Sequence, residues 1–419
     1  MKYSDLSIKR FVFCWEHILN ALKRCAKKMV FIFSIVLLLL LRILKPILRV
    51  GIVVVGSHKY GHLALEPDLM LLKLDEERGN RTKKIPIRIS IWSFGPKRFR
   101  ANNVLANLWK RRLFVVPSWL VSSLINGGER FSSLSLERRT TSIYWPANKQ
   151  KLSPSPTSFS SNQLRKGRSG LIGIGIDPTR PFVCLIVRDS GHYSDSLGQE
   201  NPAYGFRNHD IDDFSDSILS LIKRGYQVVR MGAGKETPIS LTCDGLVDYA
   251  TSGFRNELLD VYLAANCAFA ISTQTGPDAV SQLFRRPVCF IDVPMIGHFF
   301  IGSGLCTWNP LIYQKEGVKI PLQKMIELNL AWQKPLEELE KNQIKTVRST
   351  QQKIESYVLG YTDYYEAGFH LSVEDLELSA NANLILQKNL GSLGGGLFGE
   401  VKATLNPTFL RSNADWYLA

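Results

Sequence analysis

The chain has 419 residues, of which 45% are hydrophobic and 21% charged, a balance that excludes an intrinsically disordered protein and predicts two or three domains. Residues 1–50 supply +8 of the formal net charge of +15, which favours an anionic membrane surface over nucleic acid as the partner. The seven cysteines are scattered without a C-x-x-C pair, as is typical of buried thiols in a reduced cytoplasm.

The N-terminal segment predicts a helical anchor. Residues 8–28 place apolar side chains at helical spacing with Lys and Arg between them, which indicates an amphipathic surface helix. The apolar run from Met29 to Leu41 follows, and it is shorter than the roughly 20 residues that a membrane span normally needs. We therefore expect residues 1–48 to form a basic amphipathic and apolar anchor, either lying on the membrane or crossing it once. A buried core helix is the alternative.

The next stretch, residues 49–150, begins with a β-branched run from Val50 to Val55, the mark of a strand buried on both faces. A glycine-containing loop and an apolar helical pattern follow. Further strands are predicted at Ile87–Trp92 and Arg112–Val116, with a helix between them. The Ser- and Pro-rich stretch that comes next predicts a linker, residues 151–169.

The second half alternates strands and helices, which predicts an α/β domain at residues 170–335 with a parallel sheet covered on both faces. The expected strands are Phe182–Val187, Tyr226–Met231, Leu246–Tyr249, Cys267–Ile271 and Pro287–Ile291, and the expected helices are Phe214–Lys223, Asn256–Ala265 and Pro277–Phe284. A charged helical pattern starts near Pro321, and we expect residues 336–419 to form a helical extension. Two βα-rich halves across a linker imply a ligand-binding cleft.

The turn at residues 271–278 is the first candidate site. A strand runs into Thr273, Thr275 and Gly276, and Pro277 then opens a helix that includes Asp278. Proline is tolerated at the first helical position, and the free N–H groups of a first turn can bind a phosphate. An ordinary strand-to-helix turn that binds nothing is the alternative.

Arginines are expected beside this turn. Arg188 and Asp189 end one predicted strand, Arg230 and Gly232 end the next, and Arg207-Asn208 precede a helix. The carboxyl ends of parallel strands share one sheet edge, where such proteins bind ligands. Several arginines there suit a diphosphate, whereas isolated surface arginines would be solvated charges.

Two residues are candidate general bases, His62 and Asp189. The alternatives are a helix-capping role for His62 and an orienting role for Asp189 toward Arg188. The sequence contains no Ser-His-Asp set, metal-ligand cluster, Walker motif or G-x-G-x-x-G fingerprint leading into a helix, so neither a metal nor a cofactor is predicted.

Several segments resemble a family of bacterial glycosyltransferases of surface-polysaccharide synthesis. They are Val187-Arg188-Asp189, Tyr204 to Ile211, Gly225 to Gly232, Gly61-His62-Leu63-Ala64 and Asn406 to Leu410. The resemblance implies two Rossmann-like domains of the GT-B type, an acceptor-side domain at residues 49–150 and a donor-binding one at residues 170–335. Thr275-Gly276-Pro277 is also similar to a turn of heptosyltransferases, but Gln274 and Ala279 replace their Asp and His, which argues against heptose as the donated sugar.

Residues and resemblance together predict a metal-independent glycosyltransferase at the cytoplasmic face of the inner membrane. It would move a sugar from a nucleotide-sugar donor to a glycan or lipid-linked acceptor. Arg188, Arg230 and the amides after Thr275 would neutralise the departing diphosphate. The alternatives are a two-domain nucleotide-sugar epimerase and a non-catalytic scaffold that binds nucleotide sugars.

Overall fold

The computed structural model describes residues 3–79, 86–139, 153–189, 202–232, 236–296, 306–332, 334–390 and 404–419. The chain forms two compact units. Unit 1 comprises Met1–Gly56, Glu76–Arg100 and Leu113–Thr140, and unit 2 comprises Ser57–Asp75, Ala101–Arg112 and Thr141–Ala419. Most of helix α2 (Tyr60–Gly79) and all of helix α3 (Asn103–Lys110) therefore group with unit 2.

Unit 1 is built on a small parallel sheet. Strand β1 (Leu48–Val55) lies between β2 (Ile87–Phe94) and β3 (Glu137–Arg138), and all three run in the same direction. The strand predicted at Arg112–Val116 is reduced to a single bridge between Val115 and Trp92. The turn that ends helix α3 occupies residues 111–113, so only a short part of the predicted strand is left to pair.

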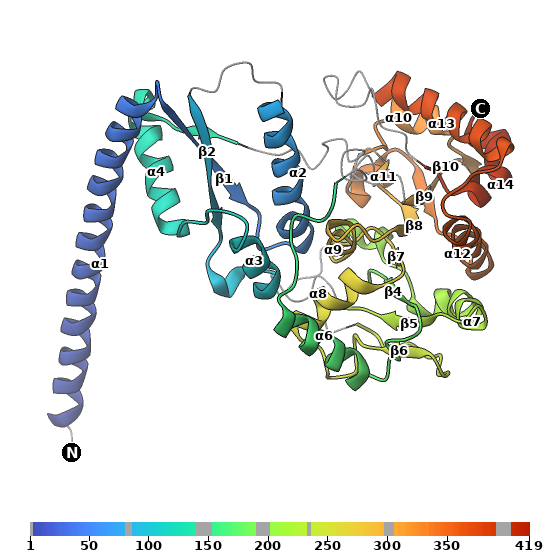
Figure 1. Cartoon of the computed structure of the whole chain (residues 1–419), viewed down its shortest axis with the longest axis horizontal. Helices are drawn as coiled ribbons and strands as arrows, with labels where there is room; N and C mark the ends of the chain where they lie inside the picture. Colours follow the sequence, from blue (N-terminus) through green and yellow to red (C-terminus); the bar gives the residue numbers. More distant parts are fainter. Residues whose placement is uncertain are drawn as a thin grey trace. The chain divides into compact units, whose positions relative to one another are not determined.

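Helix α1 (Tyr3–Leu44) is one continuous element, and its C-terminal part packs on α4 (Ser118–Arg130) in unit 1. Leu38 is fully buried in a core with Ile52 and Val121. Gly127 permits the close approach, since a Cβ there would lie 2.9 Å from Leu38 Cδ1. The N-terminal part of α1 extends beyond α4 (Figure 1). Over the residues that the structure describes, no helix is both long enough and apolar enough to cross a bilayer.

Unit 2 contains a six-stranded parallel sheet in the order β6-β5-β4-β7-β8-β9. The predicted parallel sheet is confirmed, and β9 adds a strand that the sequence does not predict. The strands are β4 (Phe182–Ile186), β5 (Gln227–Arg230), β6 (Leu246–Asp248), β7 (Ala270–Ser272), β8 (Val288–Val293) and β9 (Thr307–Pro310). Central strands β4, β7 and β8 are buried along their whole length, which accounts for their continuous apolar sequences.

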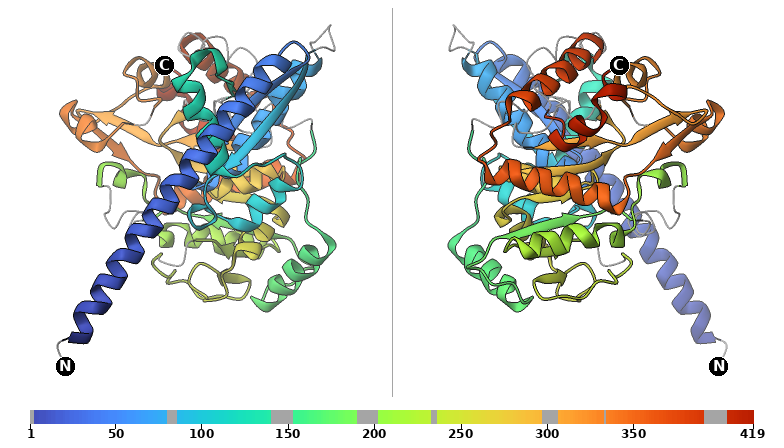
Figure 2. Two further views of the ribbon diagram at one scale, coloured as in Figure 1. Left: turned by 90° about the vertical axis from the view of Figure 1, so that its left-hand side faces the viewer. Right: turned by 90° about the vertical axis from the view of Figure 1, so that its right-hand side faces the viewer.

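Helices cover both faces of this sheet (Figure 1). On one side α8 (Glu257–Asn266) packs against α3, α6 (Ser161–Gly173) and α9 (Asp278–Leu283). On the other side α7 (Ser215–Lys223) packs against α12 (Gln351–Glu366), as the right-hand view of Figure 2 shows. The sheet is thus a doubly wound α/β layer.

Helix α6 corrects the prediction that residues 151–169 are a linker. The helix starts at Ser161, because Ser160 and Gln163 form a reciprocal capping box that satisfies the first free N–H groups. Few apolar residues mark the segment as helical. The part of the predicted linker before residue 153 lies outside the described residues.

The predicted helical stretch after Pro321 is also interrupted. Strand β10 (Ile312–Lys315) pairs antiparallel with β11 (Val318–Lys319) and with β12 (Ile344–Val347). The β-branched residues of β12 favour a strand over a helix. The helices around it are α10 (Leu322–Glu327), α11 (Leu336–Lys341), α13 (Val373–Leu390) and α14 (Pro407–Tyr417). The Gly-rich loop predicted near residues 391–399 lies outside the described residues.

Candidate functional site

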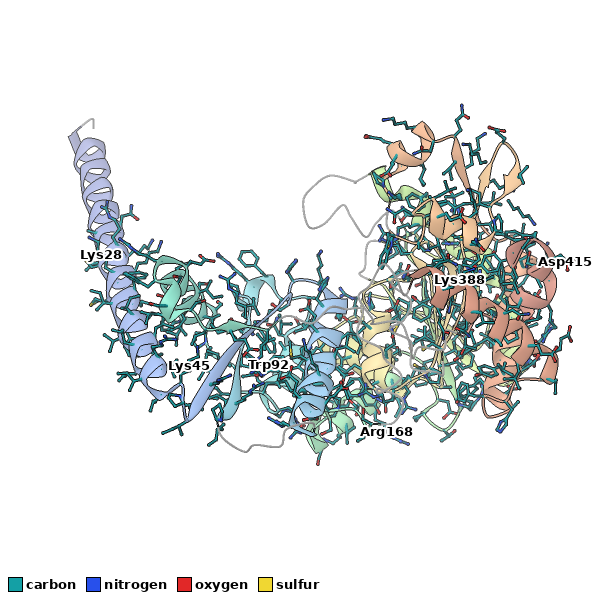
Figure 3. The ribbon with its side chains drawn as sticks, turned by 90° about the horizontal axis from the view of Figure 1, so that it is seen from above. Lys28, Lys45, Trp92, Arg168, Lys388 and Asp415 are labelled. Carbon is teal, nitrogen blue, oxygen red and sulfur yellow. The ribbon has the colours of Figure 1, made fainter. Side chains whose placement is uncertain are left out.

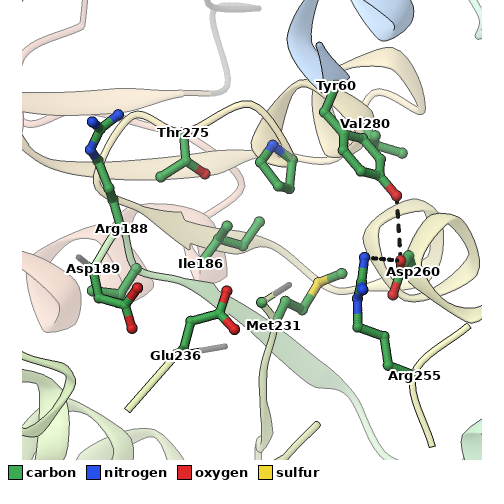
Figure 4. Close-up of a pocket in the computed structure, with 13 residues that line it drawn as sticks. Tyr60, Ile186, Arg188, Asp189, Met231, Glu236, Arg255, Asp260, Thr275 and Val280 are labelled. Atoms are coloured by element: carbon green, nitrogen blue, oxygen red, sulfur yellow. Dashed lines mark hydrogen bonds and ion pairs between the residues drawn. The ribbon is translucent and has the colours of Figure 1, made fainter. Parts of the chain in front are cut away.

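A cavity lies where the strand order of unit 2 reverses. From β4 the chain passes to β5 and β6 on one side, whereas β7 enters on the other side of β4. Doubly wound sheets bind ligands at this switch point, outside the carboxyl ends of the strands. The cavity is lined by Arg188 and Asp189 after β4 and by Thr275 and Pro277 after β7 (Figure 4). We call it the switch-point cavity.

The middle of the switch-point cavity is apolar and its two ends are polar. Ile186 and Met231 lie between the ends, while Arg188 and Arg255 stand at opposite ends (Figure 4). The space inside the cavity and its open mouth is about 650 Å³. Such a surface suits an elongated ligand with an apolar, flat part and a charged part.

The Arg188 side chain is held at one end of the cavity. It is 6% exposed, and its Nε donates to Asn208 Oδ1 at 3.0 Å. Its backbone N–H donates to Thr273 Oγ1 at 2.9 Å. The structure therefore brings together three predicted site residues, with Asn208 and Thr273 fixing the position of Arg188.

Arg230 does not line the cavity. It is 1% exposed, its Nη1 donates to both oxygens of Asp248 at 3.1–3.2 Å, and its Nη2 lies 3.6 Å from Asp189 Oδ2. The predicted contact between Arg230 and a diphosphate is thus replaced by contacts with two carboxylates. The cause is the register of the sheet, in which Arg230 on β5 lies directly beside Asp248 on β6.

Asp189 stays in the cavity wall. Its Oδ2 accepts the Thr237 N–H at 3.2 Å, in addition to the ion pair with Arg230. Gly232 also lines the cavity, beside Glu236. A Cβ at Gly232 would lie 2.5 Å from Glu236 Cδ, so glycine leaves room for this second carboxyl group.

The turn after β7 is held by a buried carboxyl group. Asp278 is 4% exposed and accepts hydrogen bonds from Ser272 Oγ and from the Thr275 N–H, both at 2.7 Å. Burial raises the pKa of Asp278 to about 6, although these hydrogen bonds oppose the shift. The Thr275 amide is therefore used inside the turn, and helix α9 has only six residues. The predicted role of Asp278 in donor binding becomes a structural one.

Two further predicted residues lie around this turn. Arg207 is the last residue of a 3₁₀ helix (Pro202–Arg207), and its Nη2 donates to the Gln274 carbonyl at 3.1 Å. Gln274 has a left-handed backbone conformation, with φ 59°, and this hydrogen bond stabilises it. Gly276 is approached closely by α2, since a Cβ there would lie 3.3 Å from Tyr60 Cβ and from the Gly61 nitrogen. Arg207 acts on the turn and is not part of the cavity wall.

His62 lies on α2, outside the lining of the switch-point cavity. Its Nδ1 forms a hydrogen bond of 2.6 Å with Glu66 Oε1, one helical turn away. The geometry gives no support to its predicted role as a general base, and a structural pairing on the helix accounts for its position.

Sequence reasoning missed the opposite end of the cavity. There Asp260, on α8, accepts a hydrogen bond from Tyr60 Oη at 3.3 Å, pairs with Arg255 Nη2 at 3.1 Å and accepts from Tyr249 Oη at 2.9 Å. Burial raises the pKa of Asp260, and Arg255 partly offsets this. One signal was visible, because Asp260 is an acidic residue inside the apolar run Leu258 to Ala265.

Within the described ranges, no three His, Cys, Asp or Glu side chains are grouped to hold a metal ion. The prediction of metal-independent catalysis remains a prediction.

No protein-family model matches the chain, and no curated protein matches it in sequence. Solved structures that resemble it include glycosyltransferases. ADP-heptose LPS heptosyltransferase II of E. coli is 15% identical, with 62% of this chain and 89% of that one covered and a TM-score of 0.37. A family 9 glycosyl transferase from Veillonella parvula is 10% identical, with 70% and 96% covered and a TM-score of 0.38.

The iron-containing dodecameric glycosyltransferase TibC of enterotoxigenic E. coli is 12% identical, with 78% of this chain and 77% of that one covered and a TM-score of 0.37. At such TM-scores a likeness carries no weight for the activity, which has to be inferred from the cavity itself.

Proposed function

We propose that the protein is a glycosyltransferase that binds a nucleotide-sugar donor in the switch-point cavity. The observation that carries the proposal is the placement of the Arg188 guanidinium at the switch point of a doubly wound sheet, at one end of an apolar cavity. The apolar middle suits a nucleobase, and the fixed cation suits the diphosphate.

In this proposal the residues at the Arg188 end perform the chemistry. The Asp189 carboxylate accepts the proton of the acceptor hydroxyl, and the acceptor oxygen then forms a bond to the anomeric carbon. The bond from that carbon to the diphosphate oxygen breaks, and the nucleoside diphosphate leaves. Arg188 stabilises the negative charge that develops on it. Arg230 holds Asp189 in place and acts as a positioning residue.

We extend the proposal to the architecture. Unit 1 and unit 2 each contain a parallel sheet with helices, as expected for two Rossmann-like domains of the GT-B type with the donor site on unit 2. The acceptor would be a glycan or a lipid-linked glycan in surface-polysaccharide synthesis. The charge on the diphosphate would be met by arginine, so catalysis would need no metal.

The surface of α1 supports a membrane partner. Large apolar side chains on it are exposed: Met29 65%, Ile32 62%, Phe33 58%, Val36 50% and Ile43 73%. Basic residues flank these apolar side chains. Lys28 lies on α1, and Lys45 lies directly after its last residue (Figure 3). An exposed apolar stripe beside basic residues suits an anionic bilayer surface. We propose that α1 docks on the cytoplasmic face of the inner membrane.

A nucleotide-release assay tests the function. The full chain is incubated with UDP-, GDP-, ADP- and CMP-sugars, with a bacterial membrane glycolipid extract as the acceptor. We expect acceptor-dependent nucleotide release from one donor class, retained within about twofold in EDTA. Conversion of the donor sugar without acceptor would indicate an epimerase instead. Binding of a donor without nucleotide release under any condition would indicate a scaffold.

A further inference from the structure

A second cavity of unit 2 shares the Asp189 wall with the switch-point cavity. It encloses about 600 Å³, including its open mouth. Its lining differs in chemistry, because it is mainly polar: Asp189, Asn208, His209, Asp210, Thr237 and Arg348 contribute to it. We call it the polar cavity. Carboxylates, an amide and a guanidinium together offer both acceptors and donors, which is what several hydroxyl groups on one small ligand require.

Arg188 connects the two cavities. Its side chain lines the switch-point cavity, and its Nε donates at 3.0 Å to Asn208 Oδ1, in the wall of the polar cavity. Asn208 is held from the other side by Arg348 Nη1, which donates to the Asn208 carbonyl at 2.6 Å. A diphosphate bound by Arg188 would therefore lie at the boundary, with a cavity of different chemistry on each side.

The polar cavity also has an unsatisfied buried group in its lining. His209 is 4% exposed, and its Nδ1 has no hydrogen-bond partner within the described residues. Its Nε2 lies 3.8 Å from the buried Asp292 Oδ2. A buried polar atom without a partner is unfavourable, so a ligand hydroxyl that reached Nδ1 would recover part of that cost.

We propose that the polar cavity binds the sugar of the nucleotide-sugar donor, while the switch-point cavity binds its nucleobase. The inference rests on the proposed function and adds the subsite that recognises the sugar. Asp189, in the wall that both cavities share, would then lie beside the anomeric carbon, between the diphosphate and the sugar. Arg348 and Asp210 become the residues that distinguish a nucleotide sugar from the bare nucleotide.

Calorimetry with the full chain tests this subsite. The probes are the nucleotide sugar of the UDP, GDP, ADP and CMP panel that the wild type binds most tightly, and the same nucleotide without its sugar. Arg348→Met should raise the Kd for the nucleotide sugar at least about tenfold and leave the Kd for the bare nucleotide within twofold. Asp210→Asn, which keeps the hydrogen bond to the Asp212 N–H, should act in the same direction.

Arg255→Met is the matched control, because Arg255 lies at the nucleobase end of the switch-point cavity. This variant should raise the Kd for the nucleotide sugar and the Kd for the bare nucleotide by the same factor. Equal losses for both probes in Arg348→Met and Asp210→Asn, or no loss in either, would overturn the sugar subsite while leaving the proposed function intact. An increase in acceptor KM alone would assign the polar cavity to the acceptor. If the wild type binds no nucleotide sugar of the panel, the proposed function fails first.

Discussion

Asp278 couples the turn after β7 to pH. Its carboxyl group is buried, and it accepts the Thr275 N–H that closes the turn. Because the pKa in the folded chain is about 6, above the ordinary 3.8, folding favours the protonated form. The corresponding stabilisation is fully present below pH 3.8 and is lost as the pH rises through 6.

Asp278→Asn removes this titration and keeps an oxygen for the Thr275 N–H. The free energy of unfolding of the wild type, relative to that of the variant, should increase by about 1 kcal/mol when the pH is lowered from 7 to 5. Denaturant unfolding at both pH values measures it, and the other titrating groups cancel in the difference. A difference that stays constant, or that changes in the opposite direction, would contradict the buried carboxyl group.

The two arginines at neighbouring strand ends show how neighbours decide a residue's role. Arg230 is enclosed by Asp248 and Asp189, and its charge is matched inside the protein. The Arg188 guanidinium donates from Nε to Asn208 Oδ1, and Arg188 lines the cavity. Arg188, unlike Arg230, is therefore placed to meet an anionic ligand in the switch-point cavity.

At the scale of elements, α12 and α14 pack at van der Waals distance through a glycine. A Cβ at Gly360 would overlap Thr408 Oγ1 and lie 3.1 Å from Thr408 Cβ. Gly360→Ala should therefore destabilise the fold by about 1–3 kcal/mol, the usual range for overpacking. Gly173→Ala, at the end of α6, meets no atom within 4 Å and should be neutral within about 0.5 kcal/mol. Thermal unfolding of the two variants compares them, and equal effects would refute the close packing of the helices.

Helix α1 carries the membrane proposal. Ile32→Gln combined with Val36→Gln removes two exposed apolar side chains without touching the core. Binding to vesicles that contain anionic lipid should weaken at least about tenfold, because each buried side chain of this size contributes about 1.5–3 kcal/mol. Flotation with liposomes measures the bound fraction.

The matched control for α1 is Leu164→Gln with Val373→Gln, two exposed positions in unit 2. That variant should bind vesicles as the wild type does. Equal binding by both double variants and the wild type would remove α1 from the membrane contact.

For the whole molecule, the elements that the sequence predicts best are those whose burial requires an apolar sequence. Strand β4 is a continuous apolar run because both of its faces are covered. Strand β1 is buried from Val50 to Val53, but Val54 is exposed, so its apolar sequence overstates its burial. Strand β12 was not predicted, since it has only four residues, one of them charged, and pairs with a distant hairpin. The low apolar content of residues 151–169 predicts a linker where helix α6 begins, although the capping-box residues Ser160 and Gln163 are present there.

The candidate site was predictable to the extent that it follows from strand ends. Arg188 and Thr275 lie in the cavity wall because the carboxyl ends of parallel strands share an edge. Arg255 and Asp260 are neighbours in the chain, but Tyr60 is 200 residues away from Asp260 and reaches it only through long-range packing. Cross-strand neighbours such as Asp248 and Arg230 depend on register, which a single sequence does not specify.

The role of Arg188 in transferring a sugar is tested most directly by kcat/KM for nucleotide release from the active donor. Arg188→Ala should lower it at least about 100-fold, the usual cost of removing one charge-stabilising donor. Arg165→Ala, an exposed arginine on α6, should stay within twofold, and both variants should unfold at the wild-type temperature. A folded Arg188→Ala protein with wild-type kcat/KM would contradict catalysis in the switch-point cavity.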